Sequence, residues 1–253
     1  MREYVRGGGN QFGKKNITEA LEGSLKRLKT DYIDLYQLHW PERFTNTFGT
    51  RGYKHISKEK WEDNFSEILL NLNELIKEGK IRHIGLSNEN PWGVMRFLEE
   101  SKQSLPRMIT IQNSYSLLNR QFEVGNAEVC KRENVGLLAY SPLGFGVLSG
   151  KYRNGDMPEN SRLKLFPNLS RFSNDNCAKA IDMYFEISQK YNLTLTEMSL
   201  AFVNDRPFVT SNIIGATSMD QLKENINSIN IKLSDEIISE INLVNEKIPN
   251  PAP

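Results

Sequence analysis

The sequence of 253 residues predicts an α/β fold with a parallel β-sheet. Three observations support this fold class. Five short runs rich in Ile, Leu and Val alternate with longer segments whose apolar residues recur at helical spacing. Short buried strands that alternate with longer amphipathic helices indicate a parallel sheet with crossover helices. The length suits one large domain, and α/β barrels commonly reach it as a single unit.

The first elements follow a polar, Gly-rich and flexible leader at residues 1–15. Asn16 and Glu19 form an N-cap pair, and apolar residues then recur on one helical face, so a helix is expected there. A short β-rich run that alternates loosely and ends before Pro41 predicts a strand at 32–38. The stretch 41–60 has no period, which predicts a long surface loop of the kind that shapes binding sites.

The alternation continues toward the C-terminus. A helix is expected from Phe65 to the helix-ending Gly79, and an irregular stretch from 141 to about 174. The other expected elements are strands at 81–86, 108–112, 135–140 and 212–214, and helices at 92–102, 123–132, 178–189, 197–203, from 218, and at 235–245. Five strands are fewer than the eight of a closed (β/α)8 barrel, so the sheet is open or the sequence is a barrel fragment.

Composition excludes several classes of partner. Lys and Arg number 32 against 31 Asp and Glu, so the net charge of +1 gives no reason to expect nucleic acid or a membrane surface. Cys130 and Cys177 lie in predicted helices and are expected to be free thiols in a reducing compartment. No signal-peptide core or transmembrane run is visible, so a cytoplasmic protein is expected. The three histidines lack metal-ligand spacing, so no metal site is predicted.

Polar residues follow four successive predicted strands. The carboxyl ends of parallel strands share one rim, which is where α/β barrels place their chemistry. Amide and hydroxyl groups there suit a planar ligand with a carboxamide, and an aromatic ring can stack on it. The four strand ends are His39, Ser87-Asn88, Gln112-Asn113 and Tyr140-Ser141.

The last predicted strand leads into an anion-binding signal. Gly215-Ala216-Thr217 follows that strand and opens a helix with Gln221, Glu224 and Asn225 on successive turns. Free backbone N–H groups and the helix dipole favour an anion at such a turn.

Taken together, these motifs resemble the ordered landmarks of the aldo-keto reductase family. The resemblance runs from about Asn16 to the C-terminal Pro-Ala-Pro, and the segments 47–49 and 113–122 are most similar to the bacterial Tas-like branch, which also resembles potassium-channel β subunits. It implies a (β/α)8 TIM barrel, of which residues 1–253 would supply one incomplete domain of about five βα units. The landmarks are Leu38-His39-Trp40, Gly85-Leu86-Ser87-Asn88, Ile111-Gln112-Asn113, Tyr140-Ser141-Pro142-Leu143 with Gly146 and Gly150-Lys151-Tyr152, and Gly215-Ala216-Thr217 with Gln221 and Glu224-Asn225.

The resemblance also implies NADPH as cofactor and a role for each matching residue. The carboxamide would be held by Ser87, Asn88 and Gln112, and the nicotinamide ring would stack on Tyr140. The pyrophosphate would be lined by Ser141, Leu143, Lys151 and Arg162, with Pro142 and Gly144 of the same motif in the cofactor set. The adenosine and its 2′-phosphate would be bound by Gly215, Thr217, Gln221, Glu224 and Asn225. His39 would be the active-site histidine that orients or polarises the substrate carbonyl.

Catalysis by this family needs an acid as well. Hydride delivery to a carbonyl leaves an alkoxide, which the family protonates with a tyrosine activated by a lysine and an aspartate. Those three residues belong to family segments that precede the region of resemblance, and Tyr4, Tyr32 and Tyr53 do not stand in the matching motif.

Three interpretations follow. The chain is a carbonyl reductase truncated at its N-terminus, whose substrate would be a small aldehyde or ketone; or a short NADPH-binding sensor or partner subunit without catalysis; or a degraded fragment with exposed strand edges. An oligomer is possible in each case.

Overall fold

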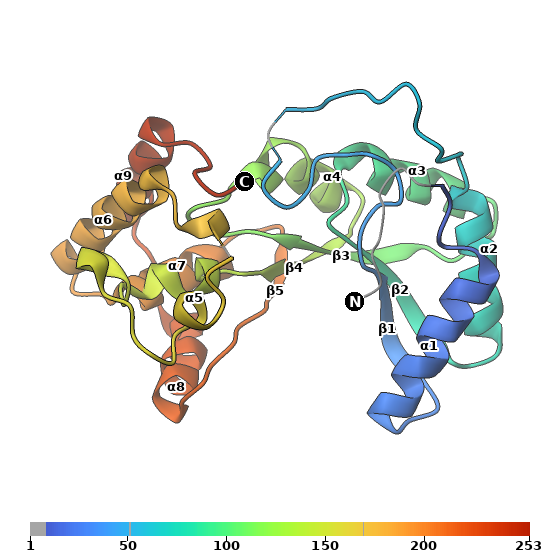
Figure 1. Ribbon diagram of the computed structural model, residues 1–253, viewed down its shortest axis with the longest axis horizontal. Coiled ribbons are helices and arrows are strands. Elements are labelled where there is room, and N and C mark those ends of the chain that lie inside the picture. The colour runs from blue at the N-terminus through green and yellow to red at the C-terminus, as the bar shows by residue number, and fades with distance from the viewer. Residues whose placement is uncertain (1–8, 51, 169) are drawn as a thin grey trace. The chain divides into compact units, whose positions relative to one another are not determined.

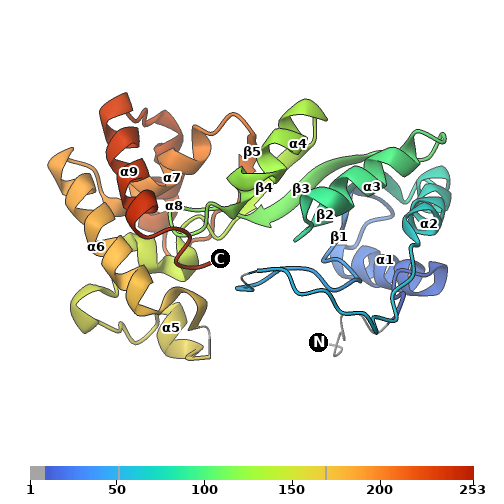
Figure 2. The same cartoon turned by 90° about the horizontal axis from the view of Figure 1, so that it is seen from above.

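The computed structural model describes residues 9–50, 52–168 and 170–253, and the chain divides into two compact units. Unit 1 comprises Met1–Gln112 and Glu128–Gly136, and unit 2 comprises Asn113–Ala127 and Leu137–Pro253. Figures 1 and 2 show the ribbon from two directions. Most of the predicted leader, residues 1–8, lies outside the described residues.

Unit 1 is built on parallel strands. β1 (Ile33–Leu38) pairs with β2 (Ile81–Ser87), and β2 pairs with β3 (Met108–Ser114). The register places Leu38 beside Leu86 and Ser87 beside Gln112. The polar residues that follow β1 and β2 therefore begin at nearly the same level of the sheet. Gly85 makes this pairing possible, since a Cβ there would lie 2.2 Å from Thr110 Oγ1.

Amphipathic helices cover these strands. They are α1 (Lys14–Leu28), α2 (Phe65–Lys77), α3 (Pro91–Ser101) and α4 (Asn126–Arg132). The first two residues of α4 belong to unit 2 and the rest to unit 1. α2 contacts α1, α3 and β2. Its buried side chains recur at three- and four-residue spacing, so one apolar stripe packs inward as the sequence predicts.

Unit 2 contains the parallel strands β4 (Gly136–Tyr140) and β5 (Val209–Asn212), which pair with each other; only Gly136 of β4 lies in unit 1. The helical core of unit 2 is built around α7 (Leu195–Asn204). Eight of the ten residues of α7 are buried, and a complete capping box between Thr194 and Glu197 fixes its start. α7 contacts α6 (Asp175–Lys190), α8 (Met219–Asn227) and β5, and α6 also packs on α9 (Asp235–Lys247). Shorter helical turns are η1 (Gln121–Val124), η2 (Gly144–Ser149), η3 (Arg153–Gly155), α5 (Arg162–Leu165), η4 (Ser170–Phe172) and η5 (Ser228–Asn230).

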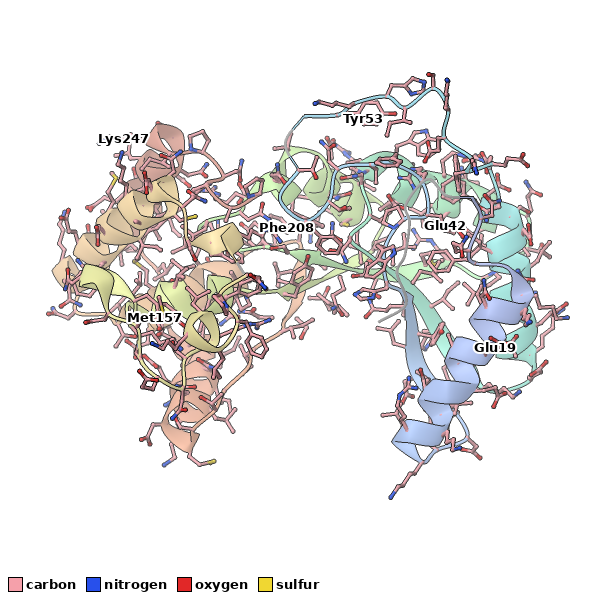
Figure 3. The ribbon with its side chains drawn as sticks, in the orientation of Figure 1. Glu19, Glu42, Tyr53, Met157, Phe208 and Lys247 are labelled. Atoms are coloured by element: carbon pink, nitrogen blue, oxygen red, sulfur yellow. The ribbon has the colours of Figure 1, made fainter. Side chains whose placement is uncertain are left out.

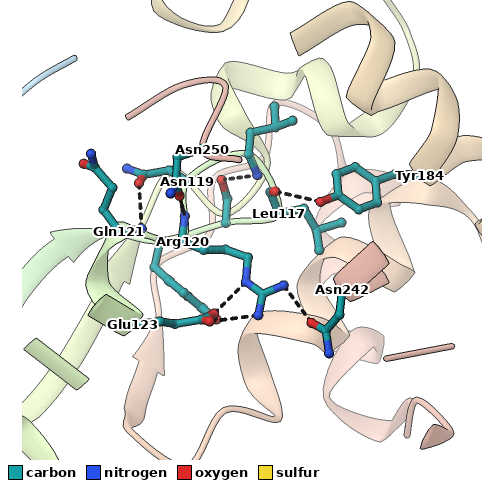
Figure 4. A network of polar contacts seen from close by, with 11 residues as sticks. Leu117, Asn119, Arg120, Gln121, Glu123, Tyr184, Asn242 and Asn250 are labelled. Carbon is teal, nitrogen blue, oxygen red and sulfur yellow. Dashed lines mark hydrogen bonds and ion pairs between the residues drawn. The ribbon is translucent and has the colours of Figure 1, made fainter. Parts of the chain in front are cut away.

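A polar network around Arg120 fastens the C-terminal segment to η1 within unit 2 (Figure 4). The guanidinium donates to both carboxylate oxygens of Glu123 at 2.8 Å and to Asn242 Oδ1 of α9 at 2.8 Å. The Arg120 backbone N–H donates to Asn250 Oδ1 at 2.6 Å. The Ala252 N–H donates to the carbonyl of Leu118 at 3.0 Å. The Pro-rich tail is therefore packed rather than loose.

The structure confirms the α/β class and its five strands within the described residues, and corrects three details. α1 begins at Lys14, two residues before the expected N-cap Asn16, whose amide instead donates to the carbonyl of Gln11. The helix expected at 123–132 is interrupted at Gly125. β5 ends at Asn212, where that strand was expected to begin.

Both cysteines are buried free thiols, as predicted. Among the described residues, no helix is long and apolar enough to span a membrane.

Candidate functional site

A cavity of about 490 Å³ lies within unit 2, in the size range typical of small-molecule sites. Its walls come from three parts of the chain: the turns that follow β4, the start of α7, and the segment from the end of β5 through α8. Ten of the fifteen predicted cofactor residues line it, namely Ser141, Pro142, Leu143, Lys151, Arg162, Gly215, Thr217, Gln221, Glu224 and Asn225.

The turn after β4 shapes one wall through left-handed backbone. Ser141, Gly144, Phe145 and Gly146 all have positive φ, of 56°, 52°, 59° and 91°. Glycine suits position 146 because it adopts positive φ without strain. A Cβ there would lie 3.1 Å from Cε and Nζ of Lys151, so the end of that side chain lies close to the turn.

Two cations face the cavity. The guanidinium carbon of Arg162 lies 4.3 Å from the ring centroid of Phe145, and the ammonium of Lys151 lies 5.2 Å from that of Tyr152. Neither cation forms an ion pair with an acidic side chain among the described residues. Positive charge without an internal counter-ion is the electrostatic condition that suits phosphate groups.

Hydrogen bonds fix the opposite wall at the start of α8. Gln221 Oε1 accepts from the backbone N–H of Thr217 at 2.9 Å and from its hydroxyl at 3.1 Å. Glu224 Oε1 accepts from the Thr194 hydroxyl at 2.7 Å, and the buried Asn225 donates its amide to the carbonyl of Gly215 at 3.2 Å. Each of these predicted side chains is therefore held in a defined place on the cavity wall.

Two predicted residues of this motif do not line the cavity. Tyr140 is half-buried at the end of β4, and its carbonyl accepts from the N–H of Tyr115 at 3.3 Å. Gly144 is buried behind the turn, where a Cβ would lie 3.0 Å from the ring of Phe172. Gly144 serves the path of the backbone rather than the cavity surface.

Sequence reasoning missed several lining residues. Thr196 of α7 is only 5% exposed, and its hydroxyl has no hydrogen-bond partner among the described residues. It lies far along the chain from the other lining segments, and no motif marks it. Gly146 and Ala216 also line the cavity; the sequence motifs include them but gave them no binding role. The further missed residues are Phe145, Ser149, Asn160, Ile213 and Ile214, most of them neighbours of predicted positions.

In unit 1 the predicted amide residues form a local cluster. The Ser87 hydroxyl donates to the carbonyl of Gln112 at 2.7 Å, and the Asn88 N–H donates to the same carbonyl at 3.0 Å. The Asn88 side-chain amide donates to the carbonyl of His39 at 2.8 Å and to Ser87 Oγ at 3.0 Å. Ser87 and Asn88 are thus anchored to β1 and β3. The side-chain amide of Gln112 makes no hydrogen bond within the described part of the chain.

His39 follows β1, with its ring centroid 4.1 Å from that of Trp40. Although the residue is exposed, its surroundings displace enough water that burial lowers the pKa of the imidazole from the usual 6.5. The side chain is therefore neutral at physiological pH. A neutral imidazole can donate one hydrogen bond and accept another.

The loop that follows His39 is anchored by two charged residues that sequence reasoning did not single out. Arg43 forms a buried bidentate ion pair with Glu89, at 2.9 and 2.5 Å. The adjacent Glu42, labelled in Figure 3, accepts hydrogen bonds from the backbone of Gln11 and Phe12 and from Asn64. Tyr53, further along the loop, is exposed (Figure 3). The loop is thus fixed at its start.

Within the described residues, no group of three or more His, Cys, Asp or Glu side chains could hold a metal ion. The polar groups that line the cavity are amides, hydroxyls, the cations of Lys151 and Arg162, and the carboxylate of Glu224, which accepts a hydrogen bond from Thr194. The two cations are the groups that suit a phosphate.

Parallel strands with crossover helices, and polar side chains at strand ends, define an α/β protein and are consistent with a (β/α)8 barrel. The aldo/keto reductase family model matches residues 4–246, and the chain belongs to that family, as the motifs predicted. It is therefore an oxidoreductase of a family that generally uses NAD(P)H and acts on small carbonyl compounds.

Three relatives illustrate the match. The chain is 50% identical over 246 residues to protein tas of Escherichia coli K12, covering 95% of this chain and 69% of tas. It is 38% identical over 263 residues to an aldo-keto reductase of Babesia bovis, covering 98% of this chain and 92% of the relative. It is 31% identical over 227 residues to the NADH-specific methylglyoxal reductase of Escherichia coli K12, covering 87% of this chain and 61% of the relative.

Proposed function

We propose that this chain binds NADPH and uses it to reduce small aldehydes or ketones to alcohols. One observation carries the proposal: the cavity of unit 2 gathers ten predicted cofactor residues around two cations that have no acidic partner among the described residues. Its volume and mixed apolar and polar lining fit part of a dinucleotide.

Each part of the cavity has a proposed partner on the cofactor. Lys151 and Arg162 bind the pyrophosphate, where charge-assisted hydrogen bonds are strongest. Thr217 and Gln221 bind at the adenosine 2′-phosphate end, and Gln221 keeps its amide nitrogen as a donor while its oxygen caps Thr217. Glu224 and Asn225 present acceptor oxygens that suit an adenine amino group.

The proposed carboxamide residues are Ser87, Asn88 and Gln112 of unit 1, with Tyr140 for the nicotinamide ring. Ser87 and Asn88 donate to backbone carbonyls, so their geometry is set before a ligand arrives. Gln112 has both an acceptor and two donors available, which match the two groups of a carboxamide.

NADPH supplies a hydride to the carbonyl carbon when it is bound. The proposed role of His39 is to donate an N–H hydrogen bond to the carbonyl oxygen, which its neutral form can do at physiological pH. Charge that develops on that oxygen is stabilised by such a donor. The proton that completes the alcohol must come from an acid whose pKa is near the working pH.

A second candidate is cofactor binding without turnover, and four of the nine tyrosines favour it. Burial raises the pKa of Tyr36, Tyr115 and Tyr184, and a hydrogen bond to Glu240 raises that of Tyr191. A tyrosine that protonates an alkoxide needs a lowered pKa. None of these four is suited to that step.

Binding and turnover are separated by two measurements on the full chain. Titration calorimetry with NADPH and NADH tests the cofactor site, and loss of near-ultraviolet absorbance on adding carbonyls, methylglyoxal among them, tests reduction. Lys151→Ala should weaken NADPH binding roughly tenfold through loss of a charged contact. The matched control is Lys164→Ala, which removes a cation outside the cavity and should leave Kd unchanged. Absence of NADPH binding to the folded wild type would reject both candidates; binding without carbonyl-dependent oxidation supports the second.

A further inference from the structure

Phe145 has a backbone conformation that its residue type disfavours. Its φ and ψ are 59° and 21°, in the left-handed region that a bulky side chain adopts only under strain. Its neighbours Gly144 and Gly146 share this region without that cost. A third glycine would therefore be the relaxed choice at position 145. The presence of phenylalanine calls for a role of its ring.

The ring lies between a core aromatic and a cavity cation. Its centroid is 4.7 Å from that of Phe172 in an edge-on arrangement, and Phe172 is only 1% exposed. The guanidinium carbon of Arg162 lies 4.3 Å from the same centroid. Phe145 and Arg162 both line the cavity of unit 2. The ring of Phe145 thus connects the buried Phe172 to the exposed guanidinium of Arg162.

We propose that Phe145 is a positioning residue whose ring holds the Arg162 guanidinium in place to bind phosphate groups of the cofactor. This rests on the proposed function. Arg162 is exposed and has no acidic partner among the described residues, so its long side chain would otherwise sample many rotamers. Ordering it before binding removes part of the entropic cost of association. The backbone strain at Phe145 is the cost of that preorganisation.

Glycine at position 145 separates this role from a structural one. Phe145→Gly relieves the strain while losing the contact with Phe172, so the two effects on stability oppose each other. We expect the unfolding midpoint to stay within roughly 2 °C of wild type. We expect Kd for 2′-phospho-ADP-ribose, a nicotinamide-free probe, to rise about fivefold through loss of one partly solvated cation–π contact. Phe145→Tyr keeps the ring and should retain wild-type Kd.

Two controls accompany these variants. Phe145→Leu keeps the strain and removes the ring, so it should lower both the unfolding midpoint and the affinity. Phe185→Leu removes a similar aromatic ring outside the cavity of unit 2, whose centroid lies 3.6 Å from the guanidinium carbon of Arg153. It should leave Kd unchanged.

A double-mutant cycle with Arg162 completes the test. In an Arg162→Ala background, Phe145→Gly should have no further effect on Kd, because the group it positions is gone. A wild-type Kd in Phe145→Gly, or an equal loss in both backgrounds, would overturn the positioning role while leaving cofactor binding intact. Failure of wild type to bind the probe would instead reject the proposed function, and this inference with it. Should Phe145→Gly not fold, the cycle run with Phe145→Leu decides by the same criterion.

Discussion

Replacing Glu89 by glutamine would leave the guanidinium of Arg43 buried without its counter-charge. The two side chains are only 3% and 9% exposed and are joined by two hydrogen bonds. Removing one partner of such a pair costs roughly 3–5 kcal/mol. The contact of Arg43 with the ring of Trp92, at 4.7 Å, exists in both wild type and variant and does not change this difference. The expected net loss is therefore about 3–5 kcal/mol.

The tryptophans give an assay specific to the affected unit. Trp40, Trp61 and Trp92, the three in the sequence, all belong to unit 1, so tryptophan fluorescence in urea reports the unfolding of that unit. With a slope of about 2 kcal/mol per molar urea, the midpoint in Glu89→Gln should fall by roughly 1.5–2.5 M. Far-ultraviolet circular dichroism should show a second, less affected transition from unit 2.

Two control variants test whether the loss of stability comes from the unpaired buried charge. Glu74→Gln breaks an ion pair with Lys14 in which both side chains are exposed, 53% for Glu74 and 69% for Lys14. Water screens such a pair, so the urea midpoint should stay close to that of wild type. The double variant Arg43→Leu/Glu89→Leu should be more stable than Glu89→Gln, because no unpaired charge remains. A shift of the urea midpoint in Glu89→Gln no larger than that in Glu74→Gln would show that the buried charge of Arg43 does not need Glu89.

Three other outcomes are expected. Burial lowers the pKa of His39, so on acidification the unfolded state binds a proton before the folded state does. The stability contributed by neutral His39 is complete above the unfolded pKa of 6.5 and falls as pH drops below it. Between about pH 7.5 and about pH 5.5 the urea midpoint should therefore fall less in His39→Gln than in wild type, and equal falls would contradict the lowered pKa. Burial raises the pKa of the Cys130 thiol to about 12, so iodoacetamide should label it only after denaturation, and rapid labelling of the native protein would be inconsistent with this environment. Gly93→Ala would place a Cβ 2.3 Å from the carboxyl carbon of Glu89 and should lower the fluorescence midpoint in urea by an amount comparable to Glu89→Gln; a wild-type midpoint would show that the pair can move aside.

Elements whose signals are local were predictable from the sequence. The stripe of α2, the Ser218 cap of α8 and the apolar strands of unit 1 each follow from spacing within a few residues. β5 was misplaced because its residues Val209–Asn212 are mostly polar, whereas the following Ile213 and Ile214 look like a strand. The structure uses those isoleucines to line the cavity instead. Apolar character alone does not distinguish a strand from a binding surface.

Part of the cavity was also predictable from local motifs. Its residues in the β4 and α8 turns stand in contiguous motifs, so their grouping could be inferred. Thr196 could not be, since it reaches the cavity from a helix with no polar motif of its own. Phe145 was hidden too, because its left-handed backbone and its contact with Arg162 are properties of the folded turn. Proximity across the chain is what sequence patterns do not record.

The network around Arg120 can form only late in translation. Its partners Asn242 and Asn250 lie at the far end of the chain, so η1 remains without these contacts until α9 and the tail have left the ribosome. Every segment of unit 1 has been translated by Gly136. Unit 1 can therefore fold while unit 2 is still being translated, whereas η1 of unit 2 gains its contacts with Asn242 and Asn250 last.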